Sequence, residues 1–229
     1  MDNQLVRYQE RFNYQPINRK QTSEGRKYVT PDGRAVASVT TILDKTKSEE
    51  KKQALQEWRN RIGHKKAQEI TTEAASRGTS MHSHLEHWLA HGQVQKKSNL
   101  VHQHSALMAT AIIEEYLEPS LNEWWGSEVG LYYPELYAGT TDLVGVYNGV
   151  PSIIDFKQTN KPKKTEWIED YFLQAAAYAA AHNAVYGTDI NQGVILMCSK
   201  DVEPQNWVVD LKEWQNKWFD RVEQYYTLP

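Results

Sequence analysis

The chain has 229 residues, enough for a domain that buries its own core without disulfides or a structural metal. Hydrophobic residues make up 40% and charged residues 24%, and no apolar run approaches the roughly 20 residues of a membrane-spanning helix, so a membrane protein is excluded. The formal net charge of -3 neither supports nor excludes binding to a polyanion, because an acidic chain can still carry a local basic groove.

No internal repeat and no linker rich in Gly, Ser or Pro divides the chain. We therefore expect one domain over 1–229, with a hairpin and helices over 1–125 and a core over 126–229. The first residues lack the apolar segment of a signal peptide, and Asp2 and Glu10 argue against a transit peptide, so we expect a cytoplasmic protein.

The first half of the chain predicts a hairpin followed by helices. Lys27–Val36 alternates apolar and polar residues around the turn sequence Pro31-Asp32-Gly33, which favours a small hairpin. Apolar residues at helical spacing among charged ones predict helices over 48–70, 71–90 and 105–117.

The second half changes from helical to strand period. Segments rich in β-branched and aromatic residues predict an antiparallel meander over 129–133, 138–147 and 152–157. A helix should follow from Thr165, a plausible N-cap residue, to Tyr186, with Gly187 ending it. Later segments predict strands over 193–199 and 207–210 and a helix over 211–226. This order predicts an α+β domain in which helices flank a mixed central sheet.

The turn between the second and third strands sets their register. Asn148-Gly149 is a preferred dipeptide for a two-residue type I′ turn, so Tyr147 should face Val150. Counting outward along both strands places Asp142 directly opposite Asp155 on the same face. At such a non-hydrogen-bonded pair the two Cβ atoms lie roughly 4.5–5.5 Å apart.

Lys157 points to the same face as Asp155, because it lies two residues further along the strand. The rest of the hairpin is apolar on both faces, so we expect both faces to be covered. Opposed carboxylates on a buried strand pair need a cation or a proton, and hard oxygen ligands favour Mg²⁺ or Mn²⁺. The alternative is an edge hairpin whose aspartates reach solvent and are neutralised by the lysine.

Asp142 followed at a distance by Asp155-Phe156-Lys157 resembles the metal-dependent PD-(D/E)xK nucleases. Two further elements of the RecB-like members are matched, upstream by Gly78-Thr-Ser-Met-His82 and downstream by Gln174-Ala-Ala-Ala-Tyr178. Ser38-Val-Thr-Thr-Ile-Leu43 and the helix after it look most like the mitochondrial genome maintenance exonuclease and phage exonuclease branch.

The resemblance implies that the restriction-endonuclease-like core carries one catalytic cluster. By this resemblance its catalytic residues would be Asp142, Asp155, Lys157, His82, Gln174 and Tyr178. Its metal ligands would be Asp142, Asp155, His82 and the backbone carbonyl of Phe156, with Glu128 as a further candidate. Lys157 would orient the attacking water or offset charge on the phosphate, and Gln174 and Tyr178 would contact that lysine or the DNA backbone. His82 taken alone could equally be a structural histidine.

Two departures from the family pattern are visible. Cys198 is the only cysteine, so this chain cannot hold an iron–sulfur cluster with four cysteines, and a reducing setting is expected. Gln158 stands where family members commonly have Thr after the catalytic lysine.

Other signals are less specific. Three lysines after the third strand could grip DNA phosphates or belong to a solvated loop: Lys161, Lys163 and Lys164. His84, His87 and His91 share a helix face and could bind a transition metal, although no cysteine or acid completes that site. Candidates for stacking on unpaired bases are Trp88, Tyr132 and Tyr133.

The function that the resemblance implies is a DNA exonuclease acting on single-stranded ends in replication, recombination or repair. A covered channel or arch for such a strand could come only from the helices before Asp142. The alternatives are a structure-selective endonuclease on the same core and a catalytically silent nucleic-acid-binding module. A compact, single-domain form without a helicase suits a bacteriophage enzyme, and the expected setting is the cytoplasm of a bacterial or phage-infected cell.

Overall fold

The structure is a computed structural model that describes residues 7–23, 25–95 and 99–228. Its strands are β1 (Arg7–Tyr8), β2 (Asn18–Thr22), β3 (Gly25–Val29), β4 (Ala35–Ser38), β5 (Leu121–Tyr133), β6 (Tyr137–Tyr147), β7 (Val150–Thr159), β8 (Gln192–Ser199) and β9 (Pro204–Asp210). Its helices are α1 (Val39–Lys45), α2 (Glu49–Ile62), α3 (His64–His91), α4 (Leu100–Ile112), α5 (Glu118–Ser120), α6 (Glu169–Tyr186) and α7 (Lys212–Thr227), with a π-helix η1 (Ile113–Leu117) and a 3₁₀ helix η2 (Thr165–Trp167).

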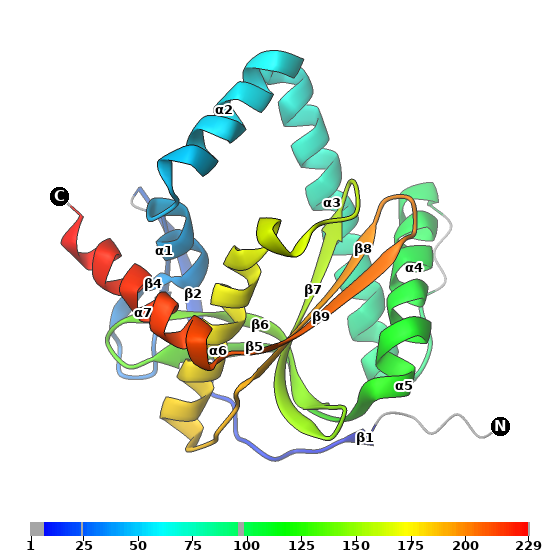
Figure 1. Cartoon of the computed structure of the whole chain (residues 1–229). Coiled ribbons are helices and arrows are strands. Elements are labelled where there is room, and N and C mark those ends of the chain that lie inside the picture. The colour runs from blue at the N-terminus through cyan, green and yellow to red at the C-terminus, as the bar shows by residue number, and fades with distance from the viewer. Residues whose placement is uncertain (1–6, 24, 96–98, 229) are drawn as a thin grey trace.

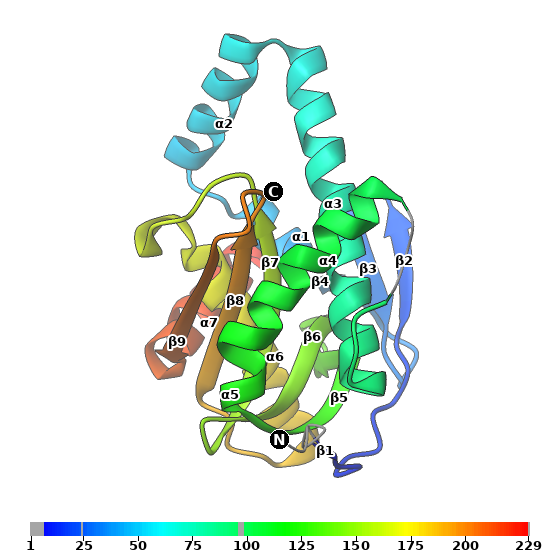
Figure 2. The ribbon, with the colours of Figure 1, turned by 90° about the vertical axis from the view of Figure 1, so that its right-hand side faces the viewer.

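One mixed sheet runs through the molecule in the order β2-β3-β4-β6-β7-β8-β9, and β5 adds to β6. β5, β6 and β7 form the predicted antiparallel meander, and β8 pairs with β7 in parallel through the crossover helix α6. Helices α3 and α4 cover one face of the sheet, whereas α1, α6 and α7 cover the other (Figures 1 and 2). The predicted α+β class with a mixed, helix-flanked sheet is therefore confirmed.

Each face of the β6–β7 hairpin packs into its own hydrophobic core. Val144 and Ile153 belong to the core that contains Phe172 of α6. Leu143 and Ile154 belong to the other core, which α3 and α4 complete. The expectation that both faces are covered is confirmed, and the edge-hairpin alternative is wrong because β6 and β7 are interior strands.

The N-terminal hairpin forms as predicted, with Tyr28 facing Val36 across β3 and β4. A further strand, β2, was missed because all of its side chains are exposed and carry no alternating apolar pattern. Ser38 then begins α1, since its hydroxyl oxygen accepts a 3.0 Å hydrogen bond from the backbone N–H of Thr41.

Several predicted boundaries are wrong for identifiable reasons. The break between α2 and α3 lies at Gly63, whose φ of 85° needs a glycine, and not at residue 70. Helix α4 begins at Leu100 because the Asn99 side chain caps it, five residues before the predicted start. Thr165 does not cap α6. It lies in η2, and its hydroxyl oxygen accepts a hydrogen bond from the indole N–H of Trp207.

The strand β5 begins at Leu121, well before the predicted Val129, and pairs with β6 despite two register shifts. Gly187 ends α6 in the left-handed conformation that was predicted. Of the helices in the described ranges, none combines the length and apolar character needed to cross a membrane.

Helix α2 and the first half of α3 rise above the sheet as two legs of an arch that meet at Gly63 (Figure 1). Helix α2 has no buried residue, and Ala67 is the one buried residue of α3 before Ser80. The foot of α2 is attached to α6, because Lys51 Nζ lies 3.2 Å from Asp170 Oδ1. The arch therefore projects from the core and is anchored at both ends.

Candidate active site

Three acidic residues stand in a row across β5, β6 and β7. The predicted hairpin register is observed from Tyr147 and Val150 out to Leu143 and Ile154, so the next opposed residues are Asp142 and Asp155. On the other side of β6, the pairs Ser127–Leu143 and Val129–Thr141 place Glu128 opposite Asp142. Asp142 is therefore flanked by a carboxylate on each neighbouring strand.

The strand ladder opens at this row. The backbone N–H of Phe156 donates a 2.7 Å hydrogen bond to Oδ2 of Asp142 in place of a carbonyl of β6. Glu128 has a φ of 50°, in the left-handed region that a glutamate rarely adopts. Both irregularities lie in the acidic row, and a positive φ at a non-glycine residue is the kind of backbone strain that is often found at functional sites.

His82 brings α3 to the same place. Its Nε2 lies 2.9 Å from the Phe156 carbonyl oxygen, and a carbonyl can only accept, so Nε2 carries the proton. In the neutral ring Nδ1 then keeps its lone pair, 3.5 Å from Oδ1 of Asp142. His82, Glu128 and Asp142 offer ligand atoms within 4.8 Å of one another, and no other group of three such residues occurs in the described chain.

Asp155 and Lys157 form a buried ion pair beside this cluster, with side chains 2% and 19% exposed. Burial raises the pKa of the Asp155 carboxyl above its ordinary value, although the Lys157 ammonium opposes the rise. Burial lowers the pKa of Lys157, but the carboxylates of Asp155 and Asp142 outweigh it and the net shift is upward. Negative charge exceeds positive charge here, which is the condition that a bound cation relieves.

Glu128 also lies where negative charge exceeds positive charge, although its side chain reaches the surface. Desolvation by neighbouring groups and the negative charges of Asp142 and Glu86 raise its pKa to about 7. Glu86 lies one turn after His82 on α3, and desolvation followed by the charge of Asp142 raises its pKa too. The carboxylates and the Phe156 carbonyl offer hard oxygen donors, and the His82 Nδ1 lone pair adds a borderline nitrogen donor, so these residues could hold a divalent metal ion.

Helix α6 closes the other side of the ion pair. Gln174 donates a 3.3 Å hydrogen bond from Nε2 to the Tyr178 hydroxyl, and Tyr178 is only 2% exposed. Gly139 makes room for that ring, because a Cβ at Gly139 would lie 2.8 Å from Cε1 of Tyr178. The ring of Tyr171, whose centroid is 5.1 Å from Lys157 Nζ, was missed although Tyr171 shares a helix face with Gln174 and Tyr178.

The other predicted residues lie apart from this cluster. Lys161 and Lys164 are exposed and Lys163 is half-buried on the loop after β7. His84 is buried and hydrogen-bonded to the His102 carbonyl, and the rings of His87 and His91 stack on each other. These three described histidines therefore do not form a group that could hold a metal ion. Of the stacking candidates, Trp88 is only 8% exposed, so the prediction that it stacks on a base is wrong. Tyr132 and Tyr133 are half-buried.

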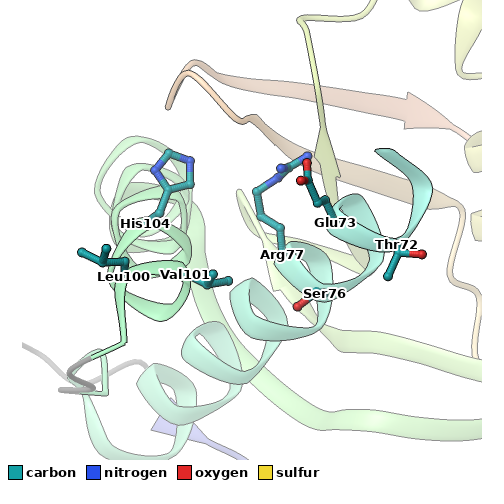
Figure 3. A pocket seen from close by; sticks show the side chains of 7 residues that line it. All are labelled: Thr72, Glu73, Ser76, Arg77, Leu100, Val101 and His104. Atoms are coloured by element: carbon teal, nitrogen blue, oxygen red, sulfur yellow. The ribbon is translucent and has the colours of Figure 1, made fainter. Parts of the chain in front are cut away.

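A separate hollow of about 480 Å³ lies between α3 and α4. Figure 3 shows Arg77 and Glu73 of α3 across from Leu100, Val101 and His104 of α4. Arg77 Nε donates a 3.0 Å hydrogen bond to Oε1 of Gln158, the residue after Lys157, and its guanidinium also contacts Asn160. Arg77 thus attaches α3 to the end of β7, a role that its sequence position did not reveal.

Comparison with known proteins gives named relatives. The chain is 29% identical over 208 residues to mitochondrial genome maintenance exonuclease 1 of Xenopus tropicalis, 26% over 206 residues to that of Homo sapiens and 28% over 206 residues to that of Mus musculus. Each match covers 83% of this chain but 57%, 58% and 59% of the respective relative, so the chain spans less than two thirds of their length. The resemblance predicted from the sequence is thereby confirmed. No family model matches.

A solved structure from Eubacterium rectale, provisionally named as an exonuclease, is also similar. The TM-score is 0.48 at 16% sequence identity, and the match covers 66% of this chain and 64% of that one.

Proposed function

We propose that this chain is a Mg²⁺- or Mn²⁺-dependent DNA exonuclease that hydrolyses phosphodiester bonds at single-stranded ends. The observation that carries the proposal is the acidic row of Glu128, Asp142 and Asp155 with His82 above it and Lys157 beside it. Relatives named as exonucleases support the same chemistry.

Each residue of the cluster has a role in that proposal. Asp142, Asp155 and His82 would hold the metal with the Phe156 carbonyl, and Glu128 would complete the ligand set. A bound Mg²⁺ or Mn²⁺ supplies Lewis acidity at the phosphate and lowers the pKa of water. The Lys157 ammonium, held in place by Asp155 and the Tyr171 ring, would orient the attacking water or offset charge on the phosphate. Gln174 would keep Tyr178 and the α6 wall in position.

The arch of α2 and α3 supports a preference for single strands. Its apex, residues 58–68, carries no Asp or Glu and presents exposed cations: Arg59, Arg61, Lys65 and Lys66. Such a cationic apex attracts a phosphate backbone, and an arch anchored at both feet would admit a flexible strand more easily than a duplex. The lysines after β7, Lys161, Lys163 and Lys164, would add phosphate contacts.

The test uses 5′- and 3′-labelled single- and double-stranded oligonucleotides and a circular single strand, each with Mg²⁺, Mn²⁺ or EDTA. We expect metal-dependent digestion of linear single strands, with the circle spared and with activity lost in Asp155→Asn and Lys157→Met. Cutting of the circle would identify an endonuclease on the same core. Binding of DNA without cleavage in either metal would identify the silent binding module.

The broader assignments belong to the same proposal. The enzyme would act in DNA replication, recombination or repair as a single nuclease domain. A bacterial or phage-infected cytoplasm is the setting expected from the sequence, whereas the relatives are named as mitochondrial. Fractionation of the native host and the genes beside this one would decide between these settings.

A further inference from the structure

The segment between β7 and α6 holds an exposed tryptophan in η2. Trp167 is 59% exposed, more than any other aromatic side chain among the described residues. Tryptophan is rarely left so open, because burying its ring is strongly favourable. The next residue, Ile168, is 2% exposed and packs into the core, so the backbone directs Trp167 outward and Ile168 inward.

The backbone around Trp167 is fixed at several points. The Lys163 N–H donates a 2.7 Å hydrogen bond to Oε1 of Gln205, and Nε2 of Gln205 donates a 3.0 Å bond back to the Lys163 carbonyl. The Trp207 indole donates to Thr165 Oγ1 at 3.0 Å, which ties η2 to β9. A loop held in this way presents its large side chains in a set arrangement, and little conformational entropy remains to be lost on binding.

Trp167 also directly precedes residues that contact both parts of the proposed substrate path. Tyr171, whose ring lies against Lys157, follows it by four residues at the start of α6. Asp170, three residues on, holds Lys51 at the foot of the arch. The segment that carries Trp167 therefore leads from the end of β7 to the foot of the arch and to the helix beside Lys157.

The charge beside the ring suits a nucleic acid. Lys164 Nζ lies 5.4 Å from the Trp167 ring centroid, and both Lys161 and Lys164 are exposed. The three lysines lie before η2 at 161–164, and the acids Glu166, Glu169 and Asp170 follow them, so the surface is mixed and its positive part lies on the β7 side of Trp167. An aromatic face with lysines alongside is the pattern that binds unpaired bases and their phosphates.

We propose that Trp167 is a stacking platform for an unpaired nucleobase of the substrate strand, with Lys164 and Lys161 beside the adjoining phosphates. The inference rests on the proposed nuclease function and adds to it the residue that distinguishes unpaired from paired bases. A base inside a duplex already stacks on both faces and offers none to Trp167. The platform accepts any base, because each has a π face.

The test measures binding in EDTA, where cleavage is stopped, by anisotropy of a labelled oligothymidylate and of copies carrying abasic sites at successive positions. We expect Trp167→Ala to weaken binding to the intact strand about five- to 100-fold, and Trp167→Phe to weaken it far less. One abasic position should weaken binding to the wild type by a similar factor and leave Trp167→Ala unaffected. Leu107→Ala, which truncates a side chain 58% exposed on α4, is the control and should bind like the wild type.

The outcomes separate this inference from the function on which it rests. If the wild type cleaves DNA and Trp167→Ala binds every strand as the wild type does, the platform is wrong and the nuclease stands. Equal weakening of intact and abasic strands by Trp167→Ala also overturns the platform, because the lost contact is then not with a base. A wild type that neither binds nor cleaves DNA overturns the proposed function itself.

Discussion

The backbone N–H of Phe156 donates a 2.7 Å hydrogen bond to the Asp142 carboxylate, and this bond joins two strands where their ladder has ended. The carboxylate therefore has a structural partner on one oxygen while the other faces His82 Nδ1 at 3.5 Å. One side chain thus closes the hairpin and contributes to the candidate metal site.

This double role predicts different effects for two substitutions of Asp142. Asp142→Asn keeps an oxygen acceptor for the Phe156 N–H, whereas Asp142→Ala leaves that donor without a partner. Both remove the same charge, so we expect Asp142→Ala to be less stable than Asp142→Asn by about 1–3 kcal/mol. Urea unfolding in EDTA measures the difference. Equal stability of the two variants would mean that the hydrogen bond contributes nothing to the fold.

Gly139 should be intolerant of any side chain. A Cβ there would lie 2.8 Å from both Cε1 and the hydroxyl oxygen of Tyr178, and the ring is buried and cannot swing to solvent. We expect Gly139→Ala to lower the free energy of unfolding by about 1–3 kcal/mol through overpacking. In a Tyr178→Ala background the same change should cost little, and a cost that persists there would place the clash elsewhere.

Stability should depend on pH through His182. Thr188 donates its hydroxyl hydrogen to Asn183 Oδ1, so it accepts from His182 Nδ1, and His182 Nε2 accepts from the Tyr14 hydroxyl at 3.0 Å. Burial lowers the pKa of this neutral histidine from 6.5 to about 4.

Between these two values the unfolded chain binds a proton that the folded chain does not. The stability associated with neutral His182 is therefore complete above pH 6.5 and declines as the pH falls toward 4. The decline should approach about 1.4 kcal/mol per pH unit, measured as the difference in free energy of unfolding between the wild type and His182→Gln. Parallel profiles for the two proteins would contradict the assignment.

The lysines after β7 should contribute to DNA affinity through their charge. Each ammonium that neutralises a phosphate of a single strand adds about 0.7 to the slope of log affinity against log salt concentration. We expect Lys161→Ala and Lys164→Ala each to reduce that slope by about this amount. Lys217→Ala removes the same charge from α7, where the ammonium lies 4.3 Å from the Trp214 ring, and should leave the slope unchanged.

The parts of the site that could be predicted are those set by short-range rules. The Asn148-Gly149 turn determines the hairpin register, and the observed pairing of Val146 with Pro151 follows from it. The opposition of Asp142 and Asp155 is then a matter of counting. The helix end at Gly187 follows equally from the left-handed conformation that glycine adopts easily.

What could not be predicted depends on contacts between distant segments. The side-chain bond from Asp142 to Phe156 replaces a ladder pair, and no periodicity distinguishes it from continued pairing. Arg77 reaches Gln158 only because α3 crosses β7, 81 residues away along the chain. The break at Gly63 was missed because charged and apolar residues alternate at helical spacing on both sides of it.

Crystals soaked in Mn²⁺ test most directly, through anomalous scattering, whether the acidic row and His82 hold the catalytic cation. We expect a peak bounded by His82, Glu128 and Asp142, which is lost in Asp142→Asn crystals soaked in the same way. A peak elsewhere, or no peak in the wild type at a Mn²⁺ concentration that supports cleavage, would contradict it.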